Sequence, residues 1–189
     1  MIADLISERA ARPDGVGEAT YDGQRIYRYR LWRAWDTNRP GVCWIMLNPS
    51  TATAAVDDRT MARVVGFSKA WRYGSSTVVN LFAFRAERPG TLNRVGDPVG
   101  THNDATILEA ASPAAHVVAA WGNHGTIANP ETGAPRCEEV RSLLASGGIE
   151  LNCLTVTDRG QPGHPLYLPA SATPAPLGQS VGPSPARIS

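Results

Sequence analysis

Cys43-Trp44-Ile45-Met46-Leu47-Asn48-Pro49-Ser50-Thr51 is the stretch of sequence that decides the fold. Five apolar residues lead into an Asn-Pro-Ser-Thr turn, and a short apolar run that stops at a turn is typical of a strand buried on both faces. Pro49 fixes its own φ and pushes Asn48 toward an extended conformation. We therefore expect the Asn48 amide at the carboxyl end of a central strand, which is where open α/β sheets bind ligands.

Three more apolar runs follow this strand, at residues 76–84, 116–121 and 149–156. Stretches with helical spacing separate them: one begins at Asp57 or Asp58 and ends at Gly74, a second begins at Asn103-Asp104, and a third covers residues 135–144. Strands that alternate with helices indicate crossover units. The sequence thus predicts an α/β fold, a three-layer α/β/α sandwich with a mainly parallel central sheet.

The rest of the chain is assigned around this core. Residues 25–35 alternate between apolar and polar side chains, which predicts a half-exposed antiparallel strand in an edge hairpin or edge strand within residues 20–40, with Arg28 and Arg30 on its solvated face. Residues 169–189 are rich in Pro, Ala and Ser and almost uncharged, so we expect a disordered tail. The globular part is then a single domain over residues 1–168.

Composition narrows the class of protein. The 189 residues carry 18 basic and 17 acidic side chains, and this near-neutral balance does not indicate a strongly charged partner. Three distant cysteines in apolar segments predict buried free thiols in a reducing compartment. The amino terminus lacks a signal-peptide pattern and no stretch approaches the ~20 apolar residues of a membrane span. We expect a cytoplasmic monomer that needs no cofactor. A metal site is not expected either, because the His and Asp residues show no recognisable ligand spacing.

Four polar signals lie at or just beyond the ends of the predicted strands: Asn48-Pro49-Ser50, Asn80, Trp121-Gly122-Asn123-His124 and Gly163-His164-Pro165. If the strands are parallel, these signals converge on one edge of the sheet. Each alone also fits an ordinary role, such as a turn, a packed ring or a solvated loop. Asp57, Asp58 and Asp104 fit helix caps, and whether any of them faces the site stays open.

The residues also carry a resemblance to known proteins. The run from Trp44 to Asn123 resembles the bacterial and phage family catalogued as domain of unknown function 1643, through Leu-Asn-Pro-Ser-Thr and Val-Asn-Leu-Phe. The order of motifs over roughly residues 42–168 in turn resembles the uracil-DNA glycosylase superfamily. That superfamily has Asp-Pro or Asn-Pro after a strand, a strand Asn that reads the base, an apolar strand ending in Trp-Gly and a closing His-Pro loop. The matches in this chain are Asn48-Pro49, Asn80, Trp121-Gly122 and His164-Pro165.

This resemblance implies hydrolysis of the N-glycosidic bond of a nucleotide flipped out of DNA. Asn48 and His164 would be catalytic: Asn48 would position the attacking water, and neutral His164 would donate a hydrogen bond to the leaving base. Asn80 would read the base edge, with Leu47, Phe82 and Trp121 around the base. The residues expected to contact DNA are Ser50, Thr51, Gly122, Asn123, Leu166 and Tyr167.

Two departures from the superfamily pattern shape the expected substrate. Uracil-selective members have Asp before the proline and soon afterwards a Tyr that excludes 5-substituted pyrimidines, whereas this chain has Asn48 and then Ser50-Thr51-Ala52. We therefore expect a 5-modified pyrimidine, a hydroxymethylated or glucosylated base of phage DNA, and a role in phage defence. Only one lysine, Lys69, could form a Schiff base, so the enzyme is expected to be monofunctional and to leave an abasic site.

Two other interpretations stay open. The chain could be a hydrolase of free modified nucleosides or nucleotides, which would share the base pocket but lack affinity for DNA. It could instead be a non-catalytic domain that binds a modified base, in which case replacing His164 with Ala would leave its function intact.

Overall fold

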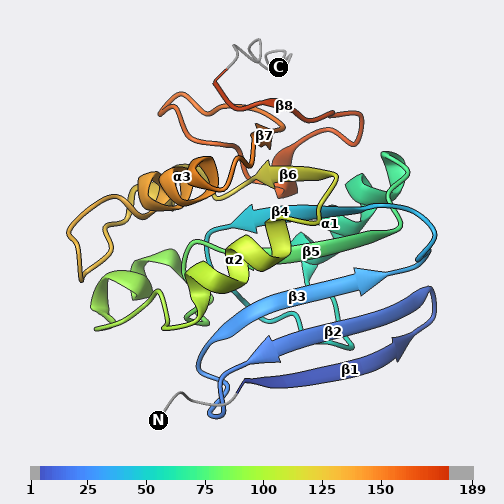
Figure 1. Cartoon of the computed structure of the whole chain (residues 1–189), viewed down its shortest axis with the longest axis horizontal. Coiled ribbons are helices and arrows are strands. Elements are labelled where there is room, and N and C mark those ends of the chain that lie inside the picture. Colours follow the sequence, from blue (N-terminus) through green and yellow to red (C-terminus); the bar gives the residue numbers. More distant parts are fainter. Residues whose placement is uncertain (1–4, 179–189) are drawn as a thin grey trace, which may run out of the picture.

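An eight-stranded mixed sheet runs through the molecule in the order β1-β2-β3-β5-β4-β6-β7-β8. The computed structural model describes residues 5–178, and Figure 1 shows the strands side by side. The four apolar runs of the sequence form the parallel centre of this sheet. They are β4 (Gly41–Met46), β5 (Ser75–Asn80), β6 (His116–Ala119) and β7 (Leu151–Cys153). Strand β4 begins two residues earlier than the predicted run, and the other three strands are shorter than predicted.

The predicted α/β class is confirmed, but the sheet as a whole is not mainly parallel. Four of its seven strand pairings are antiparallel, because strands that carry no strong apolar signal extend it on both sides. The added strands are β1 (Ile6–Arg12), β2 (Gly15–Tyr21), β3 (Arg28–Ala34) and β8 (Ala175–Pro176).

Strand β3 is not at the edge of the sheet, contrary to the sequence prediction. It lies between β2 and β5 and is antiparallel to both, since the hairpin of β1 and β2 occupies the outer positions. The register of β2 and β3 also skips a residue: Thr20 faces Arg30, but Tyr21 faces Arg28. This β-bulge breaks the alternation on which the predicted solvated Arg stripe depended, because an inserted residue turns the next side chain to the other face.

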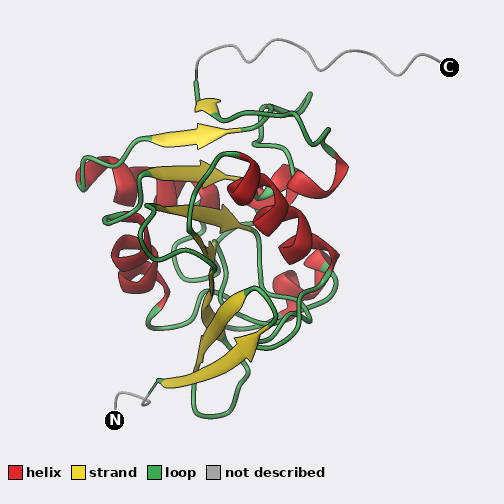
Figure 2. Ribbon diagram, turned by 90° about the vertical axis from the view of Figure 1, so that its right-hand side faces the viewer, coloured by secondary structure: helices red, strands yellow, loops and turns green. Residues whose placement is uncertain are grey.

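Helices cover both faces of the sheet, as Figure 2 shows. On one face, α1 (Arg59–Ala70) packs Val64 and Phe67 in the same core as Trp44, whereas Cys43 and Ile45 face the other core. On that other face lie α2 (Asn103–Ala111) and α3 (Arg136–Ser146). Alternate residues of β4 therefore enter two different cores, which explains why its sequence is continuously apolar.

The helix starts agree with the sequence in part. Asp58 caps α1, and its Oδ1 accepts a hydrogen bond from the Met61 backbone at 2.8 Å. Asn103 and Asp104 are not caps: His102 precedes α2 without a side-chain cap bond, and Asn103 donates instead to the Asn80 and Leu81 carbonyls. Asp104 forms an ion pair with Arg136 at the start of α3.

The described residues also contain three short 3-10 helices: η1 (Pro89–Arg94), η2 (Gly122–Thr126) and η3 (Pro165–Tyr167). The segment after η3 is tied to α1, because Arg63 donates to the Leu168 carbonyl and the Trp71 indole donates to the Ala172 carbonyl at 3.1 Å. Of the stretch expected to be a disordered tail, residues 169–178 are described and include β8, and residues 179–189 lie outside the described residues.

Two further observations concern the described residues only. None of their helices combines the length and apolar character that crossing a bilayer demands, and they contain no cluster of three or more His, Cys, Asp or Glu suited to a metal ion. The three cysteines are buried and free, as predicted.

Candidate functional site

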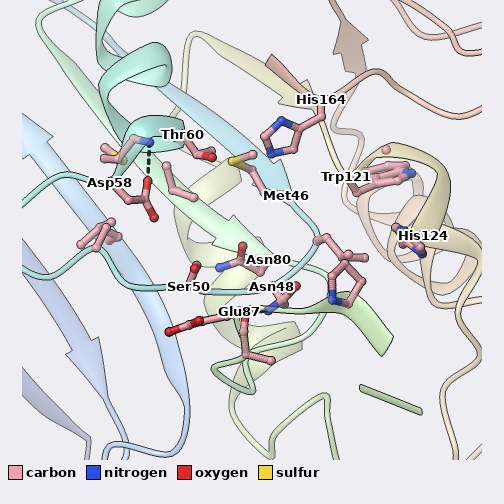
Figure 3. Close-up of a pocket in the computed structure, with 18 of the residues that line it drawn as sticks. Met46, Asn48, Ser50, Asp58, Thr60, Asn80, Glu87, Trp121, His124 and His164 are labelled. Atoms are coloured by element: carbon pink, nitrogen blue, oxygen red, sulfur yellow. Dashed lines mark hydrogen bonds between the residues drawn. The ribbon is translucent and has the colours of Figure 1, made fainter. Parts of the chain in front are cut away.

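A cavity of about 590 Å³ opens beyond the carboxyl ends of β4 and β5 and beside the exit of β6. Residues from distant parts of the chain line it, and Figure 3 shows Asn48 and Asn80 on one side of this space and His164 on the other. Its polar lining comprises Arg28, Asn48, Ser50, Asp58, Thr60, Asn80, Glu87, Asn123, His124, Thr157, His164 and Tyr167. The convergence expected from parallel strands is therefore present.

Asn48 holds the turn after β4 in place with both hydrogens of its amide. Its Nδ2 donates to the carbonyl oxygens of Pro49 at 3.0 Å and Ala86 at 2.7 Å. These bonds fix the orientation of the side chain, because an amide has only two N–H donors. The Oδ1 atom is thus the group of Asn48 that can accept a hydrogen bond from an occupant of the cavity.

Asn80 is the last residue of β5, not a mid-strand residue as the sequence suggested. Its side chain lines the cavity and is only 2% exposed, yet its Nδ2 has no hydrogen-bond partner among the described residues. Leaving such a donor unpaired costs about 1–3 kcal/mol. A ligand that accepts a hydrogen bond would remove this cost.

His164 enters the cavity from the loop before η3. Its Nδ1 accepts a hydrogen bond from the Leu166 backbone at 3.2 Å, so the proton of the neutral ring belongs on Nε2. Burial lowers the pKa of His164 below its ordinary value, opposed in part by the negative charge of Asp58. The site therefore holds a neutral imidazole with one N–H to donate.

The Trp121-Gly122-Asn123 segment links the exit of β6 to the loop that carries His164. The Trp121 indole donates to the Gln161 side chain at 2.9 Å, and Gly122 donates through its backbone to the Pro162 carbonyl at 2.8 Å. Gly122 has a φ of +68°, which favours glycine. All three residues of the segment line the cavity, and Trp121 is almost entirely buried.

Nine of the twelve residues singled out from the sequence line the cavity, and three do not. The nine are Leu47, Asn48, Ser50, Asn80, Trp121, Gly122, Asn123, His164 and Tyr167. Phe82 packs in the core beneath α2 and α3, Thr51 lines a neighbouring hollow with Arg25 and Arg85, and Leu166 lies outside both. Phe82 is displaced because β5 ends at Asn80 and the next residues turn into that core.

Arg28 and Glu87 line the cavity but were not recognised as site residues from the sequence, which left open whether Asp58 faces the site. Arg28 was assigned to a solvated face, but it is 4% exposed and lines the cavity. Asp58 caps α1 as expected and lines the cavity as well. Burial lowers the pKa of Arg28 to about 10, opposed in part by the negative charge of Asp58, so the guanidinium is positively charged at neutral pH.

The comparisons with known proteins identify a family. The model of the family described as "Protein of unknown function (DUF1643)" matches residues 28–166, so the chain belongs to this family, as its resemblance suggested. Among curated proteins and among solved structures, none matches the chain significantly. The comparisons supply no link to the uracil-DNA glycosylase superfamily, and that relationship stays a hypothesis.

Proposed function

We propose that this DUF1643 member is a monofunctional DNA glycosylase that hydrolyses the N-glycosidic bond of a flipped, 5-modified pyrimidine and leaves an abasic site. The observation that carries the proposal is the shared cavity of Asn48, Asn80 and His164, which come from three distant segments. Each offers a different unfilled hydrogen-bonding group to the same space. Each group can serve a different function in the reaction.

His164 can stabilise the leaving base. As the glycosidic bond breaks, the sugar becomes oxocarbenium-like and negative charge develops on the base. A fixed donor aimed at that charge is worth about 10²–10³ in rate. Neutral His164, with Nδ1 occupied by the Leu166 N–H, would supply this donor through Nε2–H.

Asn80 is suited to recognise the base, and Asn48 is suited to position the attacking water. The buried Asn80 amide is unpaired at Nδ2, so it can bind a carbonyl on the edge of a pyrimidine. Asn48 can accept a hydrogen bond from the attacking water through Oδ1, because its N–H groups are already used. Asp58 lines the same cavity, and its Oδ2, which takes no part in the helix cap, is a further acceptor there.

The size of the cavity supports a substituted base. A water molecule takes about 30 Å³ in the liquid, so 590 Å³ corresponds to roughly 20 waters. A pyrimidine ring with its two exocyclic groups has only about eight non-hydrogen atoms, so the cavity has room for more than an unsubstituted base. Hydroxymethylated or glucosylated bases of phage DNA are the specific substrates that we propose, with phage defence as the setting.

Lys69 supports the monofunctional assignment. The only lysine of the chain lies in α1, forms an ion pair with Asp14 and stacks its charge on Trp35 at 5.1 Å from the ring centre. It does not line the cavity. Without its amine at the sugar, Schiff-base chemistry by this residue and the strand cleavage that follows from it are not expected.

The direct test is to incubate the protein with glucosylated or hydroxymethylated phage DNA and with unmodified DNA, then treat both with alkali. Selective nicking of the modified DNA is expected, and His164→Ala should lower its rate by about 10²–10³. His116→Gln, at the exposed start of β6, is the matched control and should keep full activity. Nicking of neither DNA, equal nicking of both or an unaffected His164→Ala protein would overturn the proposal.

A hydrolase of free modified nucleosides or nucleotides is a second candidate. Asp58 and the exposed Glu87 in the lining favour a nucleoside substrate in particular, because both side chains repel the phosphates of a DNA strand and a nucleoside carries none. Duplex binding weakens steeply as salt rises, since bound phosphates release counterions. Activity that is insensitive to salt and present on nucleotides alone would select this candidate over a DNA glycosylase.

A further inference from the structure

Arg28 is a buried cation without a fixed anionic partner. Its Nη1 donates to the Ala52 carbonyl at 2.5 Å, but its Nε has no hydrogen-bond partner in the part of the chain that the structure describes. Within residues 5–178 no carboxylate lies within 4 Å of its guanidinium nitrogens. The nearby negative group that favours its charged form is Asp58, which lines the same cavity.

A β-bulge in the pairing of β2 and β3 places Arg28 in the cavity. The bulge opposite Thr20 and Tyr21 turns Arg28 to the face of the cavity, while Arg30 pairs with Glu18 at 3.5 Å. A bulge disrupts the ladder locally, and such irregularities occur often beside binding sites, where they re-aim one side chain. Desolvating the resulting charge is unfavourable unless a partner compensates for it.

A second buried donor lies on the adjacent strand. Asn80 ends β5, the neighbour of β3, and its Nδ2 also lacks a partner. Both residues line the cavity, so one positive charge and two residues that each have an unsatisfied donor border the same space. A complementary occupant presents acceptors and negative charge to this part of the wall.

We propose that the cavity binds an oxyanion at Arg28 and that its natural occupant carries a phosphate or carboxylate group close to the base. A guanidinium is the side chain best matched to an oxyanion, because its planar fork donates two parallel hydrogen bonds. Two sources can supply this chemistry: the phosphate of the bound nucleotide, or an acidic substituent on the base itself. The nucleobase part rests on the proposed function, whereas anion binding at Arg28 does not require cleavage.

Binding of small ligands to the full-length protein tests the proposal and separates the two sources. Calorimetry would compare 2′-deoxyuridine, 2′-deoxyuridine 5′-monophosphate and 5-carboxy-2′-deoxyuridine at one ionic strength. We expect at least one of the two anionic ligands to bind about tenfold or more tightly than the neutral nucleoside. Preference for the monophosphate assigns the oxyanion to the sugar phosphate, and preference for the carboxylate assigns it to the base.

Variants of β3 establish whether Arg28 is responsible. Arg28→Met should abolish the preference for the anionic ligand, and Arg28→Lys should keep part of it because the charge remains. Arg30→Gln, on the opposite face of the same strand, should leave the preference unchanged. Equal binding of all three ligands to the wild type, or a preference that survives Arg28→Met, would overturn the proposal.

The two proposals fail in different ways. If Arg28→Met does not fold, wild-type protein with the three ligands and the folded Arg28→Lys protein still decide the question. An anion preference without any nicking of modified DNA would remove the glycosylase proposal and keep the oxyanion site. Nicking of modified DNA without any anion preference would remove the oxyanion site and keep the glycosylase proposal.

Discussion

Arg28 and Arg33 are two buried arginines on one strand, and they differ in how their charge is satisfied. Arg33 is 2% exposed, and Asp57 accepts a hydrogen bond from its Nε at 2.9 Å, while the Trp32 and Thr53 carbonyls accept from its other nitrogens. Arg28 has one carbonyl acceptor and an unpaired Nε. The contrast indicates that a fully paired buried charge supports the fold, whereas one left unpaired in a cavity wall is available to a ligand.

The same contrast extends to the surroundings of the two residues. Asp57 also pairs with Arg12 at 2.6 Å, so a closed charged network joins β1, β3 and the loop before α1. The cavity wall instead contains Asn80 with a free donor and His164 with a free Nε2–H. Substitutions in the two regions should therefore affect different measurements.

The largest effect on stability should come from Arg33→Met. This change leaves Asp57 partly buried with one fewer partner, and breaking a buried pair on one side costs about 3–5 kcal/mol, with the lower end expected because Arg12 stays. Arg28→Met should cost clearly less than Arg33→Met, because loss of the hydrogen bond to the Ala52 carbonyl is offset by removal of a buried charge that has no carboxylate partner among residues 5–178. Urea unfolding measures both, and equal losses would contradict the distinction.

A smaller difference should separate Asn103 from Asn80. Asn103 is fully buried and donates to the Asn80 and Leu81 carbonyls, so Asn103→Ala leaves buried acceptors short of a partner and should cost about 1–3 kcal/mol. Asn80→Ala removes an unpaired donor and should cost less, while it abolishes base binding. Thermal unfolding with and without ligand distinguishes the two, and a larger stability loss for Asn80→Ala would contradict this assignment.

Asp58 has two roles, as the cap of α1 and as a lining residue of the cavity, so its substitution should affect both stability and activity. Asp58→Ala removes the cap of α1 and should cost about 1 kcal/mol. Asp58→Ser retains a capping oxygen but no carboxylate, so it should recover most of that stability. If the second carboxylate oxygen accepts from the attacking water, the Ser variant should still lower the cleavage rate. Full activity of the Ser variant would restrict Asp58 to the cap.

The smallest expected effect is the pH dependence that arises from His164. Because its folded pKa is lowered, the unfolded chain binds more protons below the ordinary His value of about 6.5, and stability should fall as the pH drops through that range. His164→Gln should be less sensitive to pH between about 7 and 5, and thermal unfolding across that range measures the difference. The activity of the wild type should persist below pH 6.5, since the neutral imidazole is the donor.

Several elements of the fold were accessible from the sequence. The run Cys43–Leu47 indicated a strand covered on both faces, and periodic apolar residues with Asp58 indicated α1. The antiparallel strands β1, β2 and β8 were not recognised, because their alternation is weak and their stability comes from pairing with the rest of the sheet. Their addition moved β3 from the edge into the sheet and made four of the seven pairings antiparallel.

The sequence by itself determined where the candidate site would lie, because parallel strands place their carboxyl ends along one edge and the Asn-Pro turn, Asn80 and the Trp-Gly segment follow such strands. Only the tertiary structure decided which side chains face the cavity. Arg28 and Arg30 occupy equivalent positions in an alternating pattern, and a bulge that depends on pairing with β2 sends them to opposite faces. Such pairings join residues far apart in the chain, so no local pattern records them.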